Sequence, residues 1–333
     1  MIPAQSITPH AAHHDPSGRF RNPWPESQPH GARSVLKWML TRQRGAVGEP
    51  PRMLRANTDT RKSDNAKLAI TWIGHSTFLL QSNGVNVLTD PIWSNRASPV
   101  QFAGPRRYTP SAIRFEALPR IDVVFISHDH YDHLDARTVG RITKSFPAVK
   151  WVAPLGVGDF LKKRGATNVS VRDWWEACDL GPISAFCTPA QHFSGRYPWN
   201  RNTTLWCGWV IEIGDDRVFF AGDTGLHPEF KEIARRCGPI DAAILPIGAY
   251  EPRWFMQPVH MNPEDAVLAH QALSAGNAHS SNCVFVPSHW GTFRLTDEPL
   301  DEPPRRLRAA WTAANLPESQ LKVLQLGETF ERG

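Results

Sequence analysis

The densest group of chemistry-bearing side chains lies in Phe125–Asp135, where the sequence reads FISHDHYDHLD. His128 and His130 alternate directly behind an apolar run, so the two-residue period of an extended chain directs both imidazoles to the same side. Asp132 and His133 follow where the chain is expected to turn into a helix. Imidazole nitrogens and carboxylate oxygens suit zinc or a similar divalent ion. A polar loop with histidines by chance is the alternative, and the H-x-H-x-D-H spacing favours a metal site.

Three further candidate ligands follow other apolar runs. His192 comes after ISAFCTP, Asp223 after RVFF and His289 after CVFVP, and each is followed by a turn that contains glycine. We expect these side chains at strand ends near the first cluster. Several such ligands can hold two ions that share a water molecule, and the Asp223 carboxylate could bridge them.

Strand and helix patterns alternate from Lys67 onwards. The β-rich runs are LAITWI, TFLLQ, VNVLT, DVVFIS and VKWVA, followed by LWCGWVIEI, RVFFA, AAILPI, CVFVP and LKVLQ. Helices are predicted near Ala136–Ser145, Gly158–Arg164, Pro228–Arg236 and Pro304–Ala314, and another begins at Asn262, a good N-cap followed by proline. Two successive strand-then-helix series predict an α/β fold, with two sheets packed face to face and helices on the outer faces.

The first 66 residues differ from the rest, being rich in Pro, His, Arg and Ser. We therefore predict an N-terminal extension over residues 1–66 and a main domain over residues 67–333. The extension contains one plausible helix, RSVLKWMLTRQR, in which an apolar cluster with Trp38 has a basic rim. Such a helix is typical of a membrane interface. A helix that packs on the body of the protein is the equal alternative.

Composition sets broad limits on the class of protein. The chain has 333 residues, and its 41% hydrophobic residues are ordinary for a globular enzyme. The formal net charge of +5 is consistent with an anionic partner. Its five cysteines form no CxxC pair, so a cysteine zinc site or disulfide framework is not expected. Neither a secretory signal nor an apolar run long enough to span a membrane is evident. We expect a cytoplasmic protein, with peripheral membrane association left open.

The order of these motifs resembles that of the metallo-β-lactamase fold superfamily. The resemblance implies an αββα sandwich with two zinc ions per chain. It assigns His128, His130 and His192 to one ion, Asp132, His133 and His289 to the other, and Asp223 to a bridging position. Asp90, in VLTDP, matches an aspartate that supports the ligand histidines. His75, in GHST, is interpreted as a further supporting or structural residue.

Longer phrases resemble one group of that superfamily, the phospholipases D that hydrolyse N-acylphosphatidylethanolamine. The phrases are TWIGHSTFLL, LTDPIWSNRASPVQFAGPRR, PAQHFSGR, FFAGDTG, LPIGAYEPRWFM and HWGTFRLTDEPLDEPP, and the likeness runs from NPWP at Asn22 almost to the C-terminus. The resemblance implies hydrolysis of a phospholipid phosphodiester to an N-acylethanolamine and phosphatidic acid by attack of a metal-bridging hydroxide. Asp132 and Asp223 would then be catalytic as well as metal-binding.

Substrate-binding candidates lie mainly in GAYEPRWFM. An acyl groove could be lined by the apolar members of this phrase, Tyr250, Trp254, Phe255 and Met256. Arg253 could meet the phosphate, and Gln101 and Phe102 could border the pocket. His260 could donate a proton to the leaving alkoxide or hydrogen-bond the substrate. Core packing is the alternative for the aromatic residues, and a structural role is the alternative for His260.

Other functions of the same fold compete with this interpretation. A lactonase acting on phosphorylated sugars should lack GAYEPRWFM, and a nuclease should carry a basic arm, whereas Arg and Lys are scattered here. A non-catalytic metal- or lipid-binding protein should have lost a ligand, and none is missing. We therefore expect a phospholipid substrate and no nucleic acid. Lipid access and the contacts of a homodimer, if one forms, are expected to depend on the N-terminal region.

Overall fold

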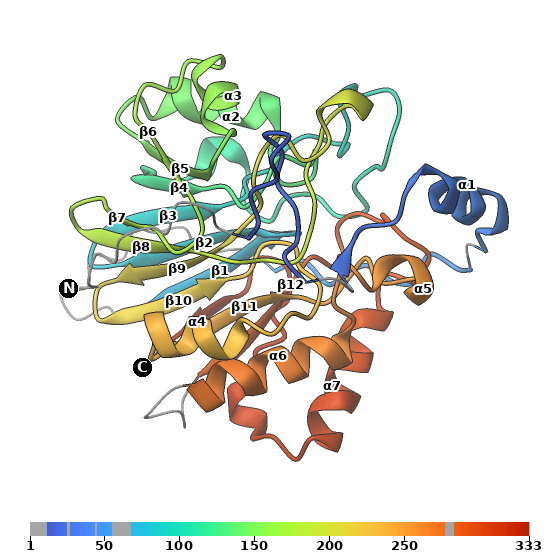
Figure 1. Ribbon diagram of the computed structural model, residues 1–333. Helices are drawn as coiled ribbons and strands as arrows, with labels where there is room; N and C mark the ends of the chain where they lie inside the picture. Colours follow the sequence, from blue (N-terminus) through green and yellow to red (C-terminus); the bar gives the residue numbers. More distant parts are fainter. Residues whose placement is uncertain (1–11, 25–26, 44, 55–67, 277–282, 333) are drawn as a thin grey trace.

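The computed structural model describes residues 12–24, 27–43, 45–54, 68–276 and 283–332. Two β-sheets pack face to face, and helices cover their outer faces (Figure 1). The α/β sandwich expected from the sequence is therefore confirmed. The expected boundary between residues 66 and 67 lies outside the described residues.

The first sheet has seven strands in the order β13-β1-β2-β3-β4-β5-β6. Their bounds are β1 Ala69–Gly74, β2 Thr77–Ser82, β3 Val85–Thr89, β4 Val123–Phe125, β5 Lys150–Pro154, β6 Val169–Arg172 and β13 Thr329–Glu331. Strands β13 to β3 pair antiparallel, and β3 to β6 pair parallel. Parallel pairing places the carboxyl ends of β3 and β4 side by side at one edge of the sheet.

The second sheet has six strands in the order β12-β11-β10-β9-β8-β7. Their bounds are β7 Ala177–Asp179, β8 Ile183–Thr188, β9 Gly208–Ile213, β10 Asp216–Phe220, β11 Ala242–Pro246 and β12 Val284–Ser288. Strands β10, β11 and β12 are parallel, and β8 runs in the same direction because β9 is antiparallel to both of its neighbours. The carboxyl ends of β8, β10 and β12 therefore share one edge.

Helices α2 and α3 cover the first sheet, whereas α4, α6 and α7 cover the second (Figure 1). The helices are α1 Ala32–Thr41, α2 Ala136–Ser145, α3 Gly158–Lys162, α4 Phe230–Cys237, α5 Arg253–Met256, α6 Pro263–Gly276 and α7 Glu302–Ala313, and the 3-10 turns are η2 Phe115–Ala117, η3 Pro198–Asn200 and η5 Glu318–Gln320. The predicted cap of α6 is confirmed, because the Asn262 side chain accepts a hydrogen bond from the backbone of Asp265 at 2.8 Å.

Two apolar clusters hold the layers together. Alternate residues of β1 explain the division: Ile70 and Trp72 belong to the large cluster between the sheets, while Ile73 belongs to the cluster beneath α2 and α3. Trp72, Phe78, Trp209 and other large side chains in the inter-sheet cluster are almost fully buried. This packing fixes the edge at which the strand ends of both sheets meet.

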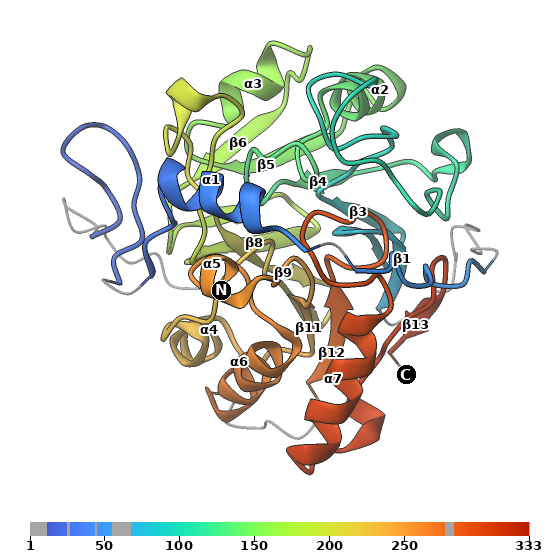
Figure 2. The same ribbon diagram turned by 90° about the vertical axis from the view of Figure 1, so that its right-hand side faces the viewer.

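The N-terminal extension lies against the sandwich. Trp38 of α1 donates a hydrogen bond to Asp297 at 2.9 Å, and Leu54 donates a backbone hydrogen bond to Leu326 at 2.7 Å. In the view of Figure 2, α1 crosses the face at which the two halves of the molecule meet. The predicted helix thus forms and packs on the body of the protein.

Two details differ from the sequence-based expectation. LKVLQ forms no strand, and only Leu321 pairs, through an isolated bridge to Phe285. The strands β6, β7 and β13 were not predicted, because each is three or four residues long and lacks an extended apolar run. Among the described residues no helix is both long and apolar enough to cross a membrane.

Candidate metal centre and adjoining cavity

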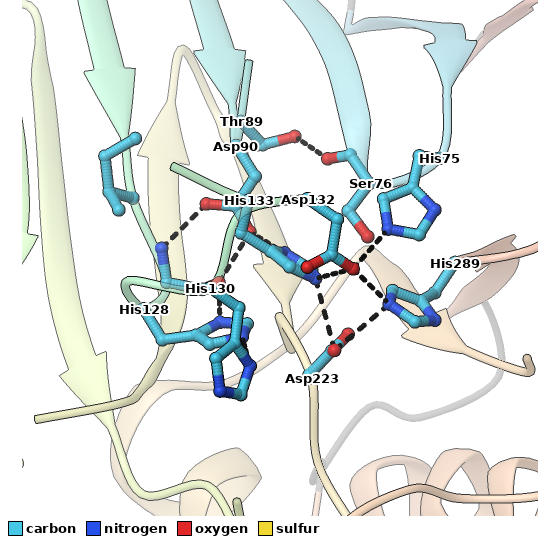
Figure 3. A network of polar contacts seen from close by, with 12 residues as sticks. His75, Ser76, Thr89, Asp90, His128, His130, Asp132, His133, Asp223 and His289 are labelled. Carbon is cyan, nitrogen blue, oxygen red and sulfur yellow. Dashed lines mark hydrogen bonds and ion pairs between the residues drawn. The ribbon is translucent and has the colours of Figure 1, made fainter. Parts of the chain in front are cut away.

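The candidate ligands meet at the seam between the two sheets (Figure 3). The loop after β4 supplies four of them, His128, His130, Asp132 and His133. The second sheet supplies the other three, because His192 follows β8, Asp223 follows β10 and His289 follows β12. The shared strand direction explains why residues separated by as much as 161 positions come together.

One part of the cluster consists of three imidazoles. His128 Nε2 lies 2.9 Å from His130 Nδ1, which lies 3.2 Å from His192 Nε2. The far nitrogens are oriented by the protein: His192 Nδ1 lies 2.9 Å from the carbonyl oxygen of Val259, and His128 Nδ1 lies 2.9 Å from Ser127 Oγ. Three nitrogens that converge on one point, with their outer ring atoms held, form a suitable half of a metal centre.

The other part combines histidines with a carboxylate. Asp132 Oδ2 lies 2.9 Å from His75 Nε2 and 3.3 Å from the Nε2 atoms of His133 and His289. Asp223 Oδ2 lies 3.0 Å from His289 Nε2, 3.1 Å from His133 Nε2 and 3.9 Å from His192 Nε2. Asp223 therefore faces both parts of the cluster, and His75 contacts Asp132 directly.

Asp90 supports the cluster from behind. Its Oδ2 lies 2.7 Å from His133 Nδ1, and its two oxygens accept hydrogen bonds from the backbone N–H and the hydroxyl of Ser127 at 2.7 and 2.5 Å. The Asp90 carboxylate thus orients the candidate ligand His133 and also holds Ser127, the residue directly before His128. This is the supporting position expected for Asp90 from the sequence.

Local backbone geometry at the cluster is unusual. His75, Asp90 and His289 adopt φ values of 54°, 33° and 61°, a region that residues other than glycine rarely occupy. Gly222, immediately before Asp223, has a φ of 61°, and an added Cβ would lie 2.5 Å from the Cβ of Ser127. Strain of this kind tends to gather at functional sites, because the rest of the fold must hold it in place.

Burial and neighbouring carboxylates shift the pKa values of the histidines in opposite directions in the two parts of the cluster. Burial lowers the pKa of His130 to about 4 and that of His192 to about 3, which leaves both imidazoles neutral. Burial opposes charge on His289 too, but Asp223 and Asp132 outweigh it and raise its pKa to about 9. The same two carboxylates raise the pKa of His133 well above its usual value, again against burial.

The donor set fits divalent metal ions. His133 Nε2 and Asp223 Oδ1 are buried without a well-formed hydrogen bond in the part of the chain that the structure describes. Among the described residues, two buried carboxylates, Asp132 and Asp223, lie among seven histidines and provide the negative charge that a cation needs, with nitrogen donors around it. Because imidazoles bind metal in their neutral form, metal binding there would depend on pH.

A cavity of about 290 Å³ opens onto the cluster. His130, Asp132, Asp223 and His260 form its floor. Its remaining lining is mostly apolar and comes from several segments: Pro29, His30, Val35, Trp38, Phe193, Arg201, Ala249, Phe255, Met256, Val259, Leu295 and Thr296. We call Pro29, His30, Val35 and Trp38, which precede the sandwich in sequence, the roof of the cavity.

Comparison with known proteins identifies the family. Residues 85–290 match the family described as the β-lactamase superfamily domain. The chain belongs to the metallo-β-lactamase superfamily. The family is one of metal-dependent hydrolases.

Curated relatives and a solved structure show which proteins the chain is similar to. The chain is 41% identical to N-acyl-phosphatidylethanolamine-hydrolyzing phospholipase D 1 of Caenorhabditis elegans over 79% of its own length and 76% of the relative's. It is equally similar, 41% over 83% of its length and 73% of the relative's, to a Mycobacterium tuberculosis protein described as uncharacterized. A solved structure of a possible metal-dependent hydrolase from Veillonella parvula covers 80% of this chain and 100% of that one, with a TM-score of 0.62 and 18% identity, which supports the fold alone.

Only some of the residues that the sequence suggested for substrate binding line the cavity. Phe255 and Met256 line it. Trp254 instead lies 43% exposed beside the Lys37 ammonium, in the wall of a neighbouring cavity of about 420 Å³. Tyr250 is fully buried and its hydroxyl donates to Glu302 at 2.7 Å, so it belongs to the core.

Arg253 and Gln101 also lie outside the cavity lining. The Arg253 guanidinium is paired with Asp265 and donates to the carbonyl of His260 at 2.8 Å, so it holds the loop that carries His260. Gln101 pairs with Arg96 within an exposed loop, where neighbouring Phe102 is 84% exposed. Local sequence does not reveal whether an apolar or charged side chain lines a cavity, packs in the core or pairs with another residue.

Several residues at the site were missed in the sequence. Arg201 is the cationic side chain among the cavity-lining residues, and its guanidinium lies 5.1 Å from the ring centre of Phe193. Asn22 donates a hydrogen bond to the His192 carbonyl at 2.9 Å and accepts one from the His192 N–H at 3.2 Å. The phrase NPWP at Asn22 was the available signal, but nothing in it indicates contact with a residue 170 positions later.

Proposed function

We propose that the protein is a zinc-dependent phosphodiesterase that hydrolyses N-acylphosphatidylethanolamine-type phospholipids to an N-acylethanolamine and phosphatidic acid. The main observation behind this proposal is a buried cluster of metal-binding type at the floor of a mostly apolar cavity with one arginine in its wall. The 41% identity to a phospholipase D that acts on this lipid supports the same substrate class.

Each residue of the candidate metal centre has a role that follows from its position. His128, His130 and His192 would hold one zinc ion, Asp132, His133 and His289 a second, and Asp223, which faces both groups, would contact both. The ions supply activation of water at neutral pH and neutralisation of phosphate charge. Asp90, His75 and Asn22 keep the ligands in position through the contacts described above.

Two side chains of the cavity have the chemistry to contact a phosphodiester. Arg201 brings positive charge to the cavity wall, where a guanidinium can pair with phosphate oxygens. His260 lines the floor with its Nδ1 3.9 Å from Asp223 Oδ2, and this nitrogen has no hydrogen-bond partner among the described residues. His260 is therefore free to hydrogen-bond a phosphate oxygen or the leaving oxygen of the substrate.

The apolar wall suits the hydrocarbon part of a lipid. Phe193, Phe255, Met256 and Val259 contribute from the sandwich, and Trp38 stacks on Phe255 from the roof with ring centres 5.2 Å apart. Contact with such side chains removes acyl surface from water at a gain of roughly 25 cal/mol per Å². A small, fully polar diester would not use these contacts.

The helix α1 lines the cavity with one side and exposes apolar side chains on another. Val35 and Trp38 face the cavity, whereas Leu36, Met39 and Leu40 are 57%, 66% and 78% exposed. We include in the proposal that these three side chains rest on a lipid surface from which the substrate enters beneath the helix. Peripheral membrane association of this kind needs no membrane-spanning helix.

The decisive experiment compares two substrates with purified protein whose zinc content has been measured. N-acylphosphatidylethanolamine in mixed micelles and bis-(p-nitrophenyl) phosphate are offered side by side, with His130→Ala as the inactive control. We expect two zinc ions per chain and a strong preference for the lipid. Metal-dependent cleavage of the soluble diester alone would remove the lipid assignment, and inactivity on both would favour a lactonase.

A further inference from the structure

A second group of metal-binding type lies outside the catalytic cluster. His13 Nε2 is 2.7 Å from Asp173 Oδ1, and His14 Nε2 is 2.7 Å from Asp173 Oδ2. The two histidines belong to the N-terminal extension, and Asp173 follows β6 directly. We call these three residues the N-terminal histidine cluster. They share no member with the catalytic cluster.

The backbone holds the two adjacent histidines in place. His14 and Phe20 pair through an isolated bridge, and the N–H of Arg21 donates to the carbonyl of His13 at 2.9 Å, so the segment folds into a short hairpin. The His13 ring stacks on Trp174 with centres 4.1 Å apart. Both imidazoles are thus oriented towards one carboxylate before any ligand arrives, which lowers the entropic cost of binding.

The charge at this cluster is negative and buried. Asp173 is 9% exposed, and in the described part of the chain its ion pairs are to His13 and His14 alone. Burial would raise the pKa of Asp173, but hydrogen bonds from both histidines and from the backbone of Trp174 outweigh burial and lower it. A buried carboxylate with two imidazoles as its partners is a suitable environment for a divalent cation.

The donor atoms also lie close enough together to share an ion. One ligand atom from each residue falls within 4.8 Å of the others. His13 and Asp173 are buried, whereas the His14 side chain is 39% exposed, so one side of the group is open to solvent. Two nitrogens and one oxygen, with an open position for water, match the ligand types and number used by zinc and similar transition metals.

We propose that His13, His14 and Asp173 bind a divalent transition-metal ion such as Zn²⁺, which fastens the N-terminal extension to the sandwich. This proposal does not depend on the proposed function. It has a consequence for the catalytic cluster, because Asn22, eight residues after His14, is hydrogen-bonded to the backbone of His192. An ion at the N-terminal histidine cluster would thus help to keep a catalytic ligand in position.

The test counts zinc ions in the full chain after equilibration against a fixed concentration of free zinc. His14→Gln keeps an amide that can donate to Asp173 but removes the imidazole ligand. Asp15→Asn is the matched control, because Asp15 lies next to the cluster and, among the described residues, its side chain bonds locally, to Ser17 and to Arg21. We expect wild type and Asp15→Asn to bind one zinc ion more than His14→Gln.

A second measurement uses the same three proteins. Hydrogen exchange of the segment from His13 to Asn22 should slow as zinc is added beyond the amount that the catalytic cluster takes up, with the affinity of this step lowered at least roughly tenfold in His14→Gln. Equal zinc counts in all three proteins, with no change in exchange, would overturn the proposal and leave a hydrogen-bonded imidazole–carboxylate clamp. Because the criterion is a difference between variants, it holds whatever number of ions the catalytic cluster binds.

Discussion

The floor and the roof of the cavity are built in different ways. The floor belongs to the cluster of candidate ligands that both sheets supply, in which His128, His192 and Asp223 are at most 3% exposed and each contacts at least one other residue of the cluster. The roof comes from a segment before the sandwich, and its helix exposes Leu40 by 78%. The difference teaches that the candidate metal ligands are fixed by the fold, whereas part of the apolar cavity lining is supplied by a segment that precedes the sandwich. Changes in the floor should therefore affect every substrate, and changes in the roof only the lipid.

The largest effect is expected from Asp223→Asn in the floor. Loss of the carboxylate that faces both ligand groups should reduce turnover of the lipid and of the soluble diester alike, on the order of 10³-fold. Bound zinc, measured by elemental analysis, should fall while the circular dichroism spectrum stays unchanged. Full activity of this variant would exclude Asp223 from the centre.

An intermediate effect is expected from Asn22→Ala, which removes the two hydrogen bonds between the N-terminal extension and the backbone of His192. The His192 N–H and carbonyl would lose their partners, and zinc affinity should weaken roughly tenfold, as for other residues that orient ligands. Ser27→Ala is the control, because the Ser27 hydroxyl donates to the Trp24 carbonyl in the same turn without touching His192. Equal zinc affinity in both variants would limit Asn22 to a packing role.

A selective effect is expected from Trp38→Ala in the roof. The lost stacking on Phe255 should lower kcat/KM for N-acylphosphatidylethanolamine roughly tenfold, through a loss of about 1.5 kcal/mol of apolar contact. Hydrolysis of bis-(p-nitrophenyl) phosphate should not change. A parallel loss with both substrates would show that the roof also supports the metal centre.

The smallest effect on chemistry is expected from the outer face of α1. Replacing Leu36, Met39 and Leu40 with serine should weaken binding to phospholipid vesicles in a sedimentation assay, by up to roughly tenfold for each side chain at about 1.5 kcal/mol or less. Turnover of the soluble diester should stay at the wild-type level. Leu268→Ser, a change at a 52% exposed leucine of α6, serves as the control. Unchanged vesicle binding by the triple variant would leave α1 as a packing element only.

The sequence predicted the floor far better than the roof. His128 to His133 form a local pattern, and His192, Asp223 and His289 each follow a recognisable strand, so the fold brings them together as expected. The same reasoning misplaced Tyr250 and Arg253, because an aromatic or basic side chain has the same local signal in the core, in an ion pair and in a cavity. Trp38, Arg201 and Asn22 depend on contacts between distant segments, which spacing along the chain does not record.

The position of the centre at the seam has a consequence for the whole molecule. Its candidate ligands come from the first sheet through the loop after β4 and from the second through the ends of β8, β10 and β12. Ions held there would cross-link the two layers of the sandwich. A ligand present at 1,000 times its Kd stabilises the folded state by about 4 kcal/mol, a large part of the stability of an ordinary domain. The availability of metal would then determine how much protein stays folded, and with it the lifetime of the chain in the cell.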